Sequence, residues 1–383
     1  MSVNGNKKKV TAVVPARNCR RELAVCLAAL CGGDCPPEII VVDDASDDGT
    51  AQMVREKWPS AVLLQTPVHT GFAHAANLGL RLVRTEYALL IRPQLQPGRS
   101  CVRKLLEALE PSIFCAVPRP SFRASTARSE ALPSGSGAFR PAARTGGMAE
   151  KKRNGKNNGS AVNTNSGSAV LTLAVPDGCA MYRMKTLEEI GWLDERHFDG
   201  LEALDLSLRA AVFGAWTVQV PGAHVRPVRT ADREVPRNAY GLPMDTFRRQ
   251  LAAGNWIYVL YKHFAGLPGF LFFRLAAAAV QPAQRRSFGR RGEKDAFRMA
   301  QIRGKALCSL ERERRGALEQ GVSVWAENLP DAAFLGMDKE AERVYPLFLA
   351  EQSPFSAAGI REVLGARELF CRSLPEILDQ CVF

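Results

Sequence analysis

The sequence predicts an α/β protein built on a mostly parallel, Rossmann-like sheet with helices on both faces. Short apolar segments alternate with helical segments through the first hundred residues. This βαβ alternation requires crossover helices, which cover both faces of a parallel sheet. The chain has 383 residues, 46% of them hydrophobic, so it is long enough to bury a sizeable core. A disordered or fibrous protein is therefore excluded.

The expected elements follow in order, each from its own apolar run or helical period. Strands are expected at Val10–Pro15, Glu38–Val42, Ala61–Leu64, Tyr87–Ile91, Val170–Val175 and Trp216–Val220. Helices are expected at Glu22–Leu30, Thr50–Lys57, Phe72–Val83, Lys185–Ile190 and Leu204–Val212, and the pattern is helical again from Asp245. Ligands of such sheets bind at the carboxyl ends of the strands. The residues that follow each strand are therefore the first candidates for a site.

One long segment interrupts this order. Residues 121–168 are rich in Ser, Gly, Ala, Asn and basic residues and poor in large apolar ones, which predicts a flexible basic loop. Composition alone fits an inserted loop and a linker between two domains about equally. Apolar periodicity resumes at Ala169, which favours an insertion within one α/β domain over residues 1–244. Residues 245–383 are then a helical C-terminal region.

The net charge of +12 is concentrated in two segments. Residues 119–165 hold nine basic and two acidic residues, and residues 285–315 hold eleven and four. Such patches favour anionic partners. The apolar run Phe264–Val280 contains Pro268 and Arg274, which makes it a poor bilayer span. We expect either a helix in the membrane interface, with the basic cluster on an anionic surface, or a buried helix followed by a solvated one. Nucleic-acid binding is not expected, because the basic segments lack interleaved aromatic residues.

The ten cysteines include no Cys-x-x-Cys pair, so no zinc site is expected. No apolar stretch near the N-terminus is long enough for a secretory signal. Free thiols and a cytoplasmic location are the expectation.

The sharpest local motif is Val41-Val42-Asp43-Asp44-Ala45-Ser46-Asp47-Asp48-Gly49-Thr50. It places carboxylates directly after a buried strand, where they can accept hydrogen bonds from a base or a ribose. A turn followed by a helix N-cap explains the same residues equally well.

Further motifs stand in order around it. They are Val13-Val14-Pro15-Ala16-Arg17-Asn18, Thr70-Gly71-Phe72-Ala73-His74-Ala75-Ala76-Asn77-Leu78-Gly79 and Ala88-Leu89-Leu90-Ile91-Arg92-Pro93-Gln94, then Asp177-Gly178-Cys179-Ala180-Met181-Tyr182, Ile190-Gly191-Trp192-Leu193-Asp194-Glu195 and Gly200-Leu201-Glu202-Ala203-Leu204-Asp205-Leu206-Ser207-Leu208-Arg209. Together this order, over about residues 10–265, resembles the family 2 glycosyltransferases. They are inverting enzymes of the GT-A fold group that includes rhamnosyl- and galactosyltransferases.

The resemblance implies a function and a set of site residues. It implies transfer of a hexose from a nucleotide-sugar donor to a lipid-linked or cell-surface glycan. Pro15 and Arg17 would border the nucleotide, and Asp43 or Asp44 would contact its base. The turn from Gly71 to Asn77 would shape the same pocket, although a helix start and a buried amide are the alternative roles of those two residues.

The chain also departs from the family pattern at three positions. The family holds Mn²⁺ or Mg²⁺ with an Asp-x-Asp motif, but here the position reads Arg92-Pro93-Gln94, so no metal ligand is assigned. The family places a base directly after an acceptor-half Glu, but Ala203 follows Glu202. Pro227 stands where a histidine often completes the metal site, and His224 lies three residues earlier.

Two functional hypotheses follow from these departures. In the first, Arg92 supplies the charge of the lost metal ion, Glu202 or Asp205 acts as the base, and transfer is metal-independent. Asp205 falls where the family's helix begins, which favours a role as helix cap or as the i+4 partner of Arg209 over that of a base. In the second, the chain is a catalytically inactive scaffold that binds a nucleotide-sugar or regulates a partner transferase.

Overall fold

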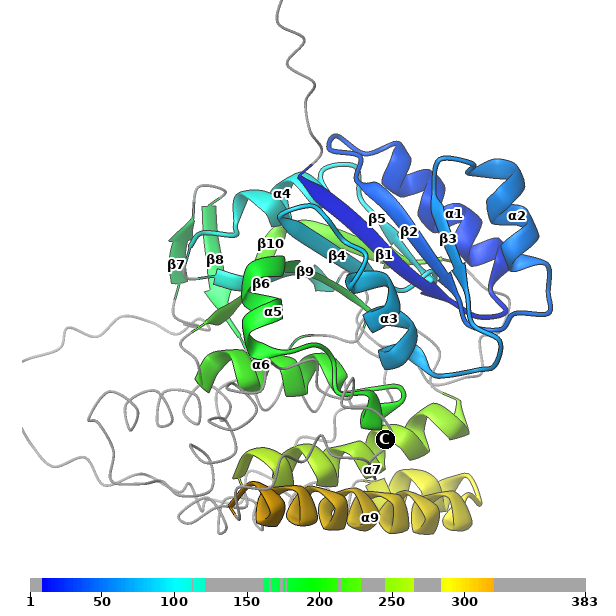
Figure 1. The fold of residues 1–383 in the computed structure, drawn as a ribbon, viewed down its shortest axis with the longest axis vertical. Coiled ribbons are helices and arrows are strands. Elements are labelled where there is room, and N and C mark those ends of the chain that lie inside the picture. The colour runs from blue at the N-terminus through cyan, green and yellow to red at the C-terminus, as the bar shows by residue number, and fades with distance from the viewer. Residues whose placement is uncertain are drawn as a thin grey trace, which may run out of the picture.

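A computed structural model describes residues 9–111, 113–120, 161–164, 167–172, 175, 178–212, 215–228, 245–264 and 284–319. In Figure 1 a twisted sheet forms the centre of the molecule, and the long helices α7 (Thr246–Phe264) and α9 (Lys294–Glu319) lie side by side in a separate layer next to it.

The described sheet has ten strands in the order β3-β2-β1-β4-β9-β6-β10-β8-β7, with β5 paired to β10. The strands are β1 Val10–Ala16, β2 Glu38–Asp43, β3 Val62–Gln65, β4 Tyr87–Ile91, β5 Leu95–Pro97, β6 Ile113–Pro120, β7 Ala161–Thr164, β8 Gly167–Leu171, β9 Cys179–Arg183 and β10 Trp216–Pro227. The first four strands are parallel, as predicted. Beyond β4 the sheet is mixed, because β9 pairs antiparallel with both β4 and β6.

Helices cover both faces of this sheet. They are α1 Arg20–Cys31, α2 Thr50–Lys57, α3 Phe72–Leu80, α4 Cys101–Glu107, α5 Met184–Ile190 and α6 Glu202–Val212, with a 3-10 turn η1 at Glu195–His197. Successive side chains of β1 point to opposite faces of the sheet. Ala12 and Val14 pack into the core that contains α1, and Val13 packs into the core under α3. A Cβ atom at Gly79 would lie 2.4 Å from Val13 Cγ1, so α3 needs glycine there to approach the sheet.

The predicted elements of the first hundred residues are confirmed, with α2 and β4 at the predicted bounds. One expectation was wrong: β7 and the start of β8 form a hairpin within residues expected to be loop, and the strand expected at Val170–Val175 overlaps only the end of β8. The hairpin extends the sheet because β8 pairs antiparallel with β10, a pairing that the sequence did not reveal. Residues 121–160 of the expected loop lie outside the described residues.

The C-terminal helices pack closely on each other. Gly254 of α7 and Gly304 of α9 face each other, and a Cβ atom at either would lie 2.8 Å from a backbone oxygen of the opposite helix. Among the described residues, no helix is long and apolar enough to cross a bilayer. The expected interfacial segment after Phe264 lies outside them, and the domain boundary at residue 244 stays a prediction.

Candidate functional site

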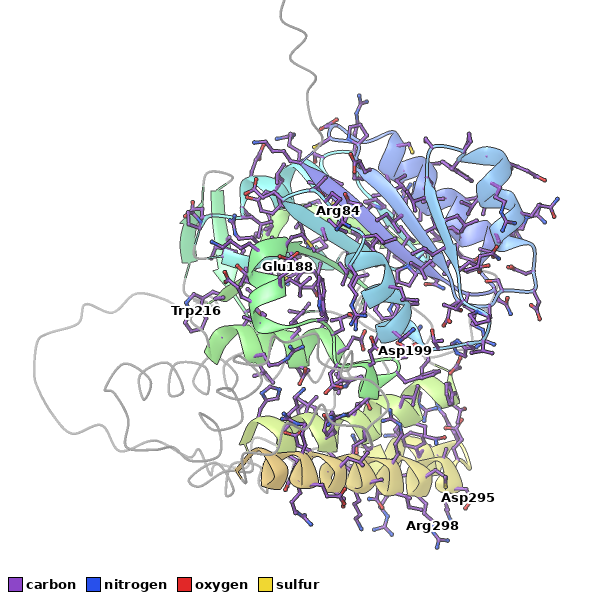
Figure 2. The ribbon with its side chains drawn as sticks, in the orientation of Figure 1. Arg84, Glu188, Asp199, Trp216, Asp295 and Arg298 are labelled. Atoms are coloured by element: carbon purple, nitrogen blue, oxygen red, sulfur yellow. The ribbon has the colours of Figure 1, made fainter. Side chains whose placement is uncertain are left out.

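A cavity of about 570 Å³ lies at the carboxyl ends of β1, β2 and β4. Four of the predicted nucleotide-binding residues line it, namely Pro15, Arg17, Asp44 and Arg92. The other wall comes from Phe198 and Asp199 and from the start of α7. Figure 2 shows Asp199 at the junction between the sheet and the C-terminal helices.

Asp44 holds the loop that follows β3. Its carboxylate accepts hydrogen bonds from the Thr66 hydroxyl at 2.9 Å, from the Thr70 amide and hydroxyl, both at 2.8 Å, and from the Gly71 amide at 3.0 Å. His69 Nδ1 lies 2.7 Å from the same carboxylate. Burial opposes ionisation of Asp44, but these donors stabilise the charged form and leave its pKa lowered. Asp44 is therefore an ionised residue that both lines the cavity and fixes its rim.

Asp43 and Gly71 support the cavity without lining it. The Asp43 side chain is fully buried and accepts a hydrogen bond from Gln65 Nε2 at 3.1 Å. Gly71 has φ +92, and a Cβ atom there would lie 2.6 Å from the ring of Phe198. Glycine is required at this position because its conformation is left-handed and because the Phe198 ring fills the space.

Asn77 holds two backbone segments together. Its amide nitrogen donates to the Leu193 carbonyl at 2.9 Å and to Glu195 at 2.8 Å, and its oxygen accepts from the Leu193 amide at 3.1 Å. His74 Nδ1 lies 2.7 Å from the same Glu195. Asn77 is therefore a buried amide, the alternative role that the sequence allowed, and it joins α3 to the segment before η1.

Arg92 replaces the metal-binding motif and is firmly held. Its guanidinium lies 3.6 Å from the centroid of the Phe72 ring. Nη2 donates to Asp199 Oδ1 at 2.5 Å and lies 3.5 Å from Glu202 Oε1. Asp199 Oδ2 also accepts from Arg248 Nε at 3.0 Å. Burial opposes the charge on Asp199, yet Arg248 and Arg92 lower its pKa to about 2.

The two predicted catalytic carboxylates lie behind the cavity. Glu202 is 1% exposed and sits against Arg92 at the start of α6. Asp205 is fully buried and pairs with Arg209 at 3.0 Å and with Lys262 and His263, both at 2.8 Å. Asp205 does not line the cavity, and these three partners hold its carboxylate. The pairing with Arg209 that the sequence allowed is present.

The residues at the family's metal position do not fit a divalent cation. Arg92 brings a positive charge there, and the nearby Asp199 is already shared by two arginines. One group among the described residues has the geometry of a metal site, with ligand atoms of Asp194, His197 and Asp205 within 4.8 Å of one another. The Lys262 ammonium lies 2.8 Å from both carboxylates of that group, so a cation already balances them.

The sequence analysis missed Asp199, Arg248 and the aromatic residues of the cavity. Phe198 and Phe247 contact each other edge to face, with ring centroids 6.1 Å apart. A backbone signal marks this wall, because Phe198 and Leu201 have φ of 62 and 67, which non-glycine residues rarely adopt. The segment from Arg248 to His263 also resembles the family's next helix, but no role in the site was predicted for Arg248.

Comparisons with known proteins agree with this geometry. Residues 11–191 match the family described as Glycosyl transferase family 2. The match confirms the resemblance and, with the observed sheet, the predicted fold class. No curated protein matches the chain.

Several solved structures match the chain at low sequence identity. A mannosyltransferase from Pyrobaculum calidifontis in complex with GDP-Man and Mn²⁺ is 16% identical, with 97% of this chain and 87% of that chain covered and a TM-score of 0.46. S. aureus TarS is 14% identical, with 77% and 55% covered and a TM-score of 0.42. GalNAc-T7 with UDP, GalNAc and Mn²⁺ is 13% identical, with 77% and 54% covered and a TM-score of 0.48. The chain thus spans about half the length of the last two.

Proposed function

Because the chain belongs to glycosyltransferase family 2 through residues 11–191, we propose that it transfers a hexose from a nucleotide-sugar donor to a hydroxyl acceptor without a divalent cation. One observation carries this proposal. The family's metal position is taken by Arg92, whose side chain lines the cavity and is fixed by Phe72 and Asp199.

The charge of Arg92 suits the reaction. Transfer leaves negative charge on the departing nucleoside diphosphate, and fixed cations stabilise it. A guanidinium donates two parallel hydrogen bonds to phosphate oxygens and stays charged at every physiological pH. Arg92 is held before a ligand arrives, so little side-chain entropy is lost on binding. Pro15, Arg17 and Asp44 would then contact the nucleotide.

Glu202 is the proposed base, and its surroundings also support a second function. A base must come within hydrogen-bond reach of the acceptor hydroxyl. Glu202 is buried against Arg92, and Ala203 stands where the family places its base. That observation favours a catalytically inactive scaffold that binds a nucleotide-sugar or regulates a partner transferase.

The proposed acceptor is a lipid-linked or cell-surface glycan, reached at the cytoplasmic face of an anionic membrane. The outer side of α9 supports this location, because Met299 and Ile302 are 51% and 50% exposed and Lys305 and Arg312 are exposed on the same helix. Apolar and basic side chains together are typical of helices that lie on anionic lipid. Co-sedimentation with phosphatidylglycerol vesicles but not with phosphatidylcholine vesicles would support it, and equal or absent binding would refute it.

Turnover measurements distinguish the two functions. Purified protein is given UDP-, GDP- and dTDP-hexoses in EDTA or in Mn²⁺, and nucleotide release is followed for the wild type, Glu202→Gln and a control, Glu188→Gln. Glu188 is exposed on α5, does not line the cavity, and lies apart from Asp199 (Figure 2). Release in EDTA that Glu202→Gln lowers about 10²-fold or more and Glu188→Gln leaves unchanged supports the transferase. Nucleotide binding without release supports the scaffold, and release that requires Mn²⁺ refutes the metal-free mechanism.

A further inference from the structure

Asp199 bridges the two best-held arginines of the cavity. Its Oδ1 accepts from Arg92 at 2.5 Å and its Oδ2 accepts from Arg248 at 3.0 Å. Both arginines line the cavity, and the three side chains are 5%, 16% and 17% exposed for Arg92, Arg248 and Asp199. Two guanidinium groups on one carboxylate form an arrangement that also fits phosphate, since guanidinium pairs with both groups through similar forked hydrogen bonds.

The charges of the cavity explain why this bridge matters. Three arginines and three aspartates line the cavity. Asp44 is occupied by the donors of its own loop, and Asp245 Oδ1 accepts from the Arg248 amide at 2.8 Å at the start of α7. Asp199 is thus the lining carboxylate that is shared between arginine side chains. A dianionic ligand therefore binds most favourably when it takes the place of the Asp199 carboxylate between the two guanidinium groups.

The backbone that carries Asp199 is fixed, so such an exchange involves the side chain. Asn255 Nδ2 of α7 donates to the carbonyls of His197 at 2.8 Å, Asp199 at 3.1 Å and Gly200 at 2.8 Å. Arg303 of α9 donates to the Asn255 side-chain oxygen and to the His197 carbonyl. Rotation of the Asp199 side chain releases both guanidinium groups without moving these contacts.

We propose that Arg92 and Arg248 form a two-arginine clamp for the diphosphate of the ligand, and that Asp199 occupies the same subsite until a bound diphosphate replaces it. The inference rests on the proposed function for the class of ligand. It adds Arg248, which lies outside the matched residues 11–191, and assigns Asp199 as an internal competitor.

Binding measured by calorimetry in EDTA tests the clamp. The probes are UDP, GDP and inorganic pyrophosphate, with uridine as the ligand that lacks phosphate. Arg248→Gln is expected to weaken UDP and pyrophosphate binding by about tenfold or more, the size of one charge-assisted hydrogen bond, and to leave uridine binding unchanged. Asp199→Asn is expected to tighten both diphosphates, because the internal competitor is lost.

Two further variants complete the design. Arg84→Gln removes one exposed charge at the opposite end of β4 from Arg92, away from Asp199 (Figure 2), and is expected to bind every probe as the wild type does. Arg248→Lys keeps the charge but not the fork, and is expected to bind with intermediate affinity. Thermal unfolding of every variant shows whether it is folded. If Arg248→Gln folds poorly, the affinity of Arg248→Lys for the probes tests the clamp instead.

The outcomes separate this inference from the proposed function. UDP binding in EDTA that Arg248→Gln and Arg248→Lys leave unchanged overturns the clamp, and transfer activity can still stand. Weaker diphosphate binding by a folded Asp199→Asn overturns the role as competitor. Clamp behaviour as expected, with no sugar transfer from any donor, refutes the transferase and leaves the clamp standing.

Discussion

Replacement of Lys262 by methionine tests the buried charges beneath the cavity. The Lys262 ammonium lies 2.8 Å from Asp194 Oδ2 and 2.8 Å from Asp205 Oδ1, and all three side chains are at most 1% exposed. Tyr258 also donates to Asp194 at 2.7 Å. In Lys262→Met two ionised carboxylates stay buried at the same place without that cation. The two carboxylates then either repel each other or one of them takes up a proton, and both outcomes destabilise the native state at pH 7.

The structure gives the size of the effect. Loss of one partner from a buried ion pair costs about 3–5 kcal/mol. For a folded body of this size, 1 kcal/mol shifts Tm by about 2–4 °C, so Lys262→Met should unfold about 6–20 °C lower than the wild type. Lys57→Met, at the exposed end of α2, is the matched control and should change stability by less than about 0.5 kcal/mol.

The pH dependence supplies an independent readout. Burial opposes the charge of Asp194, but Lys262 and Arg196 lower its pKa from 3.8 to about 2. A folded pKa below the unfolded one stabilises the native state above about pH 4, and this stabilisation, about 2 kcal/mol, is lost as the pH falls toward 2. In Lys262→Met the carboxylate pKa values rise, so the stability gap to the wild type should narrow as the pH falls from 7 to 4.

Urea unfolding at pH 7, 5.5 and 4 measures that gap. A gap below about 1 kcal/mol at pH 7 would show that the ion cluster contributes little beyond its packing. A gap that widens on acidification would refute the assignment of ionised Asp194 and Asp205 in the native state.

Three further variants test individual contacts. Gly71→Ala should destabilise by about 1–3 kcal/mol in urea unfolding, because φ is +92 and a phenyl ring fills the Cβ position; Gly289→Ala, which meets nothing within 4 Å, is its control. Asn77→Ala should cost about 1–3 kcal/mol, because it leaves buried backbone groups without partners; an unchanged urea midpoint would contradict this role. Gly304→Leu should separate α7 from α9 and speed amide exchange in α7, and unchanged exchange would refute the close packing.

The sequence predicted the first half of the fold well because its signals are local. The apolar residues of helix α2 recur with helical spacing, and those of strand β4 form a continuous run. The first and last residues of both elements were predicted correctly. The same logic placed Asp44 at the cavity, since it follows a parallel strand at the edge where ligands bind, and the family resemblance placed Arg92 there. Strand β9 was not predicted as a strand, because its antiparallel pairing with β4 depends on contacts about ninety residues away.

The roles of the site residues were harder to assign from the sequence, for a different physical reason. Asn77 and Asp205 are polar residues in recognisable motifs, but the structure uses both to satisfy buried groups. A motif does not report which partners a buried polar side chain will meet in the folded protein. Asp199 and Arg248 were missed for the reverse reason, because their chemistry exists only where two distant segments meet.

A regular spacing of polar residues in α7 nevertheless determines how this helix packs against the segment 194–205. Arg248, Asn255 and Lys262 are seven residues apart, and seven residues are close to two helical turns, so the three side chains share one face of α7. Each contacts the segment 194–205: Arg248 at Asp199, Asn255 at three carbonyls and Lys262 at two carboxylates. An apolar stripe would bury this face as well but would tolerate sliding or rotation of the helix. A polar stripe that must match fixed partners admits one register, and that register places Arg248 beside Arg92.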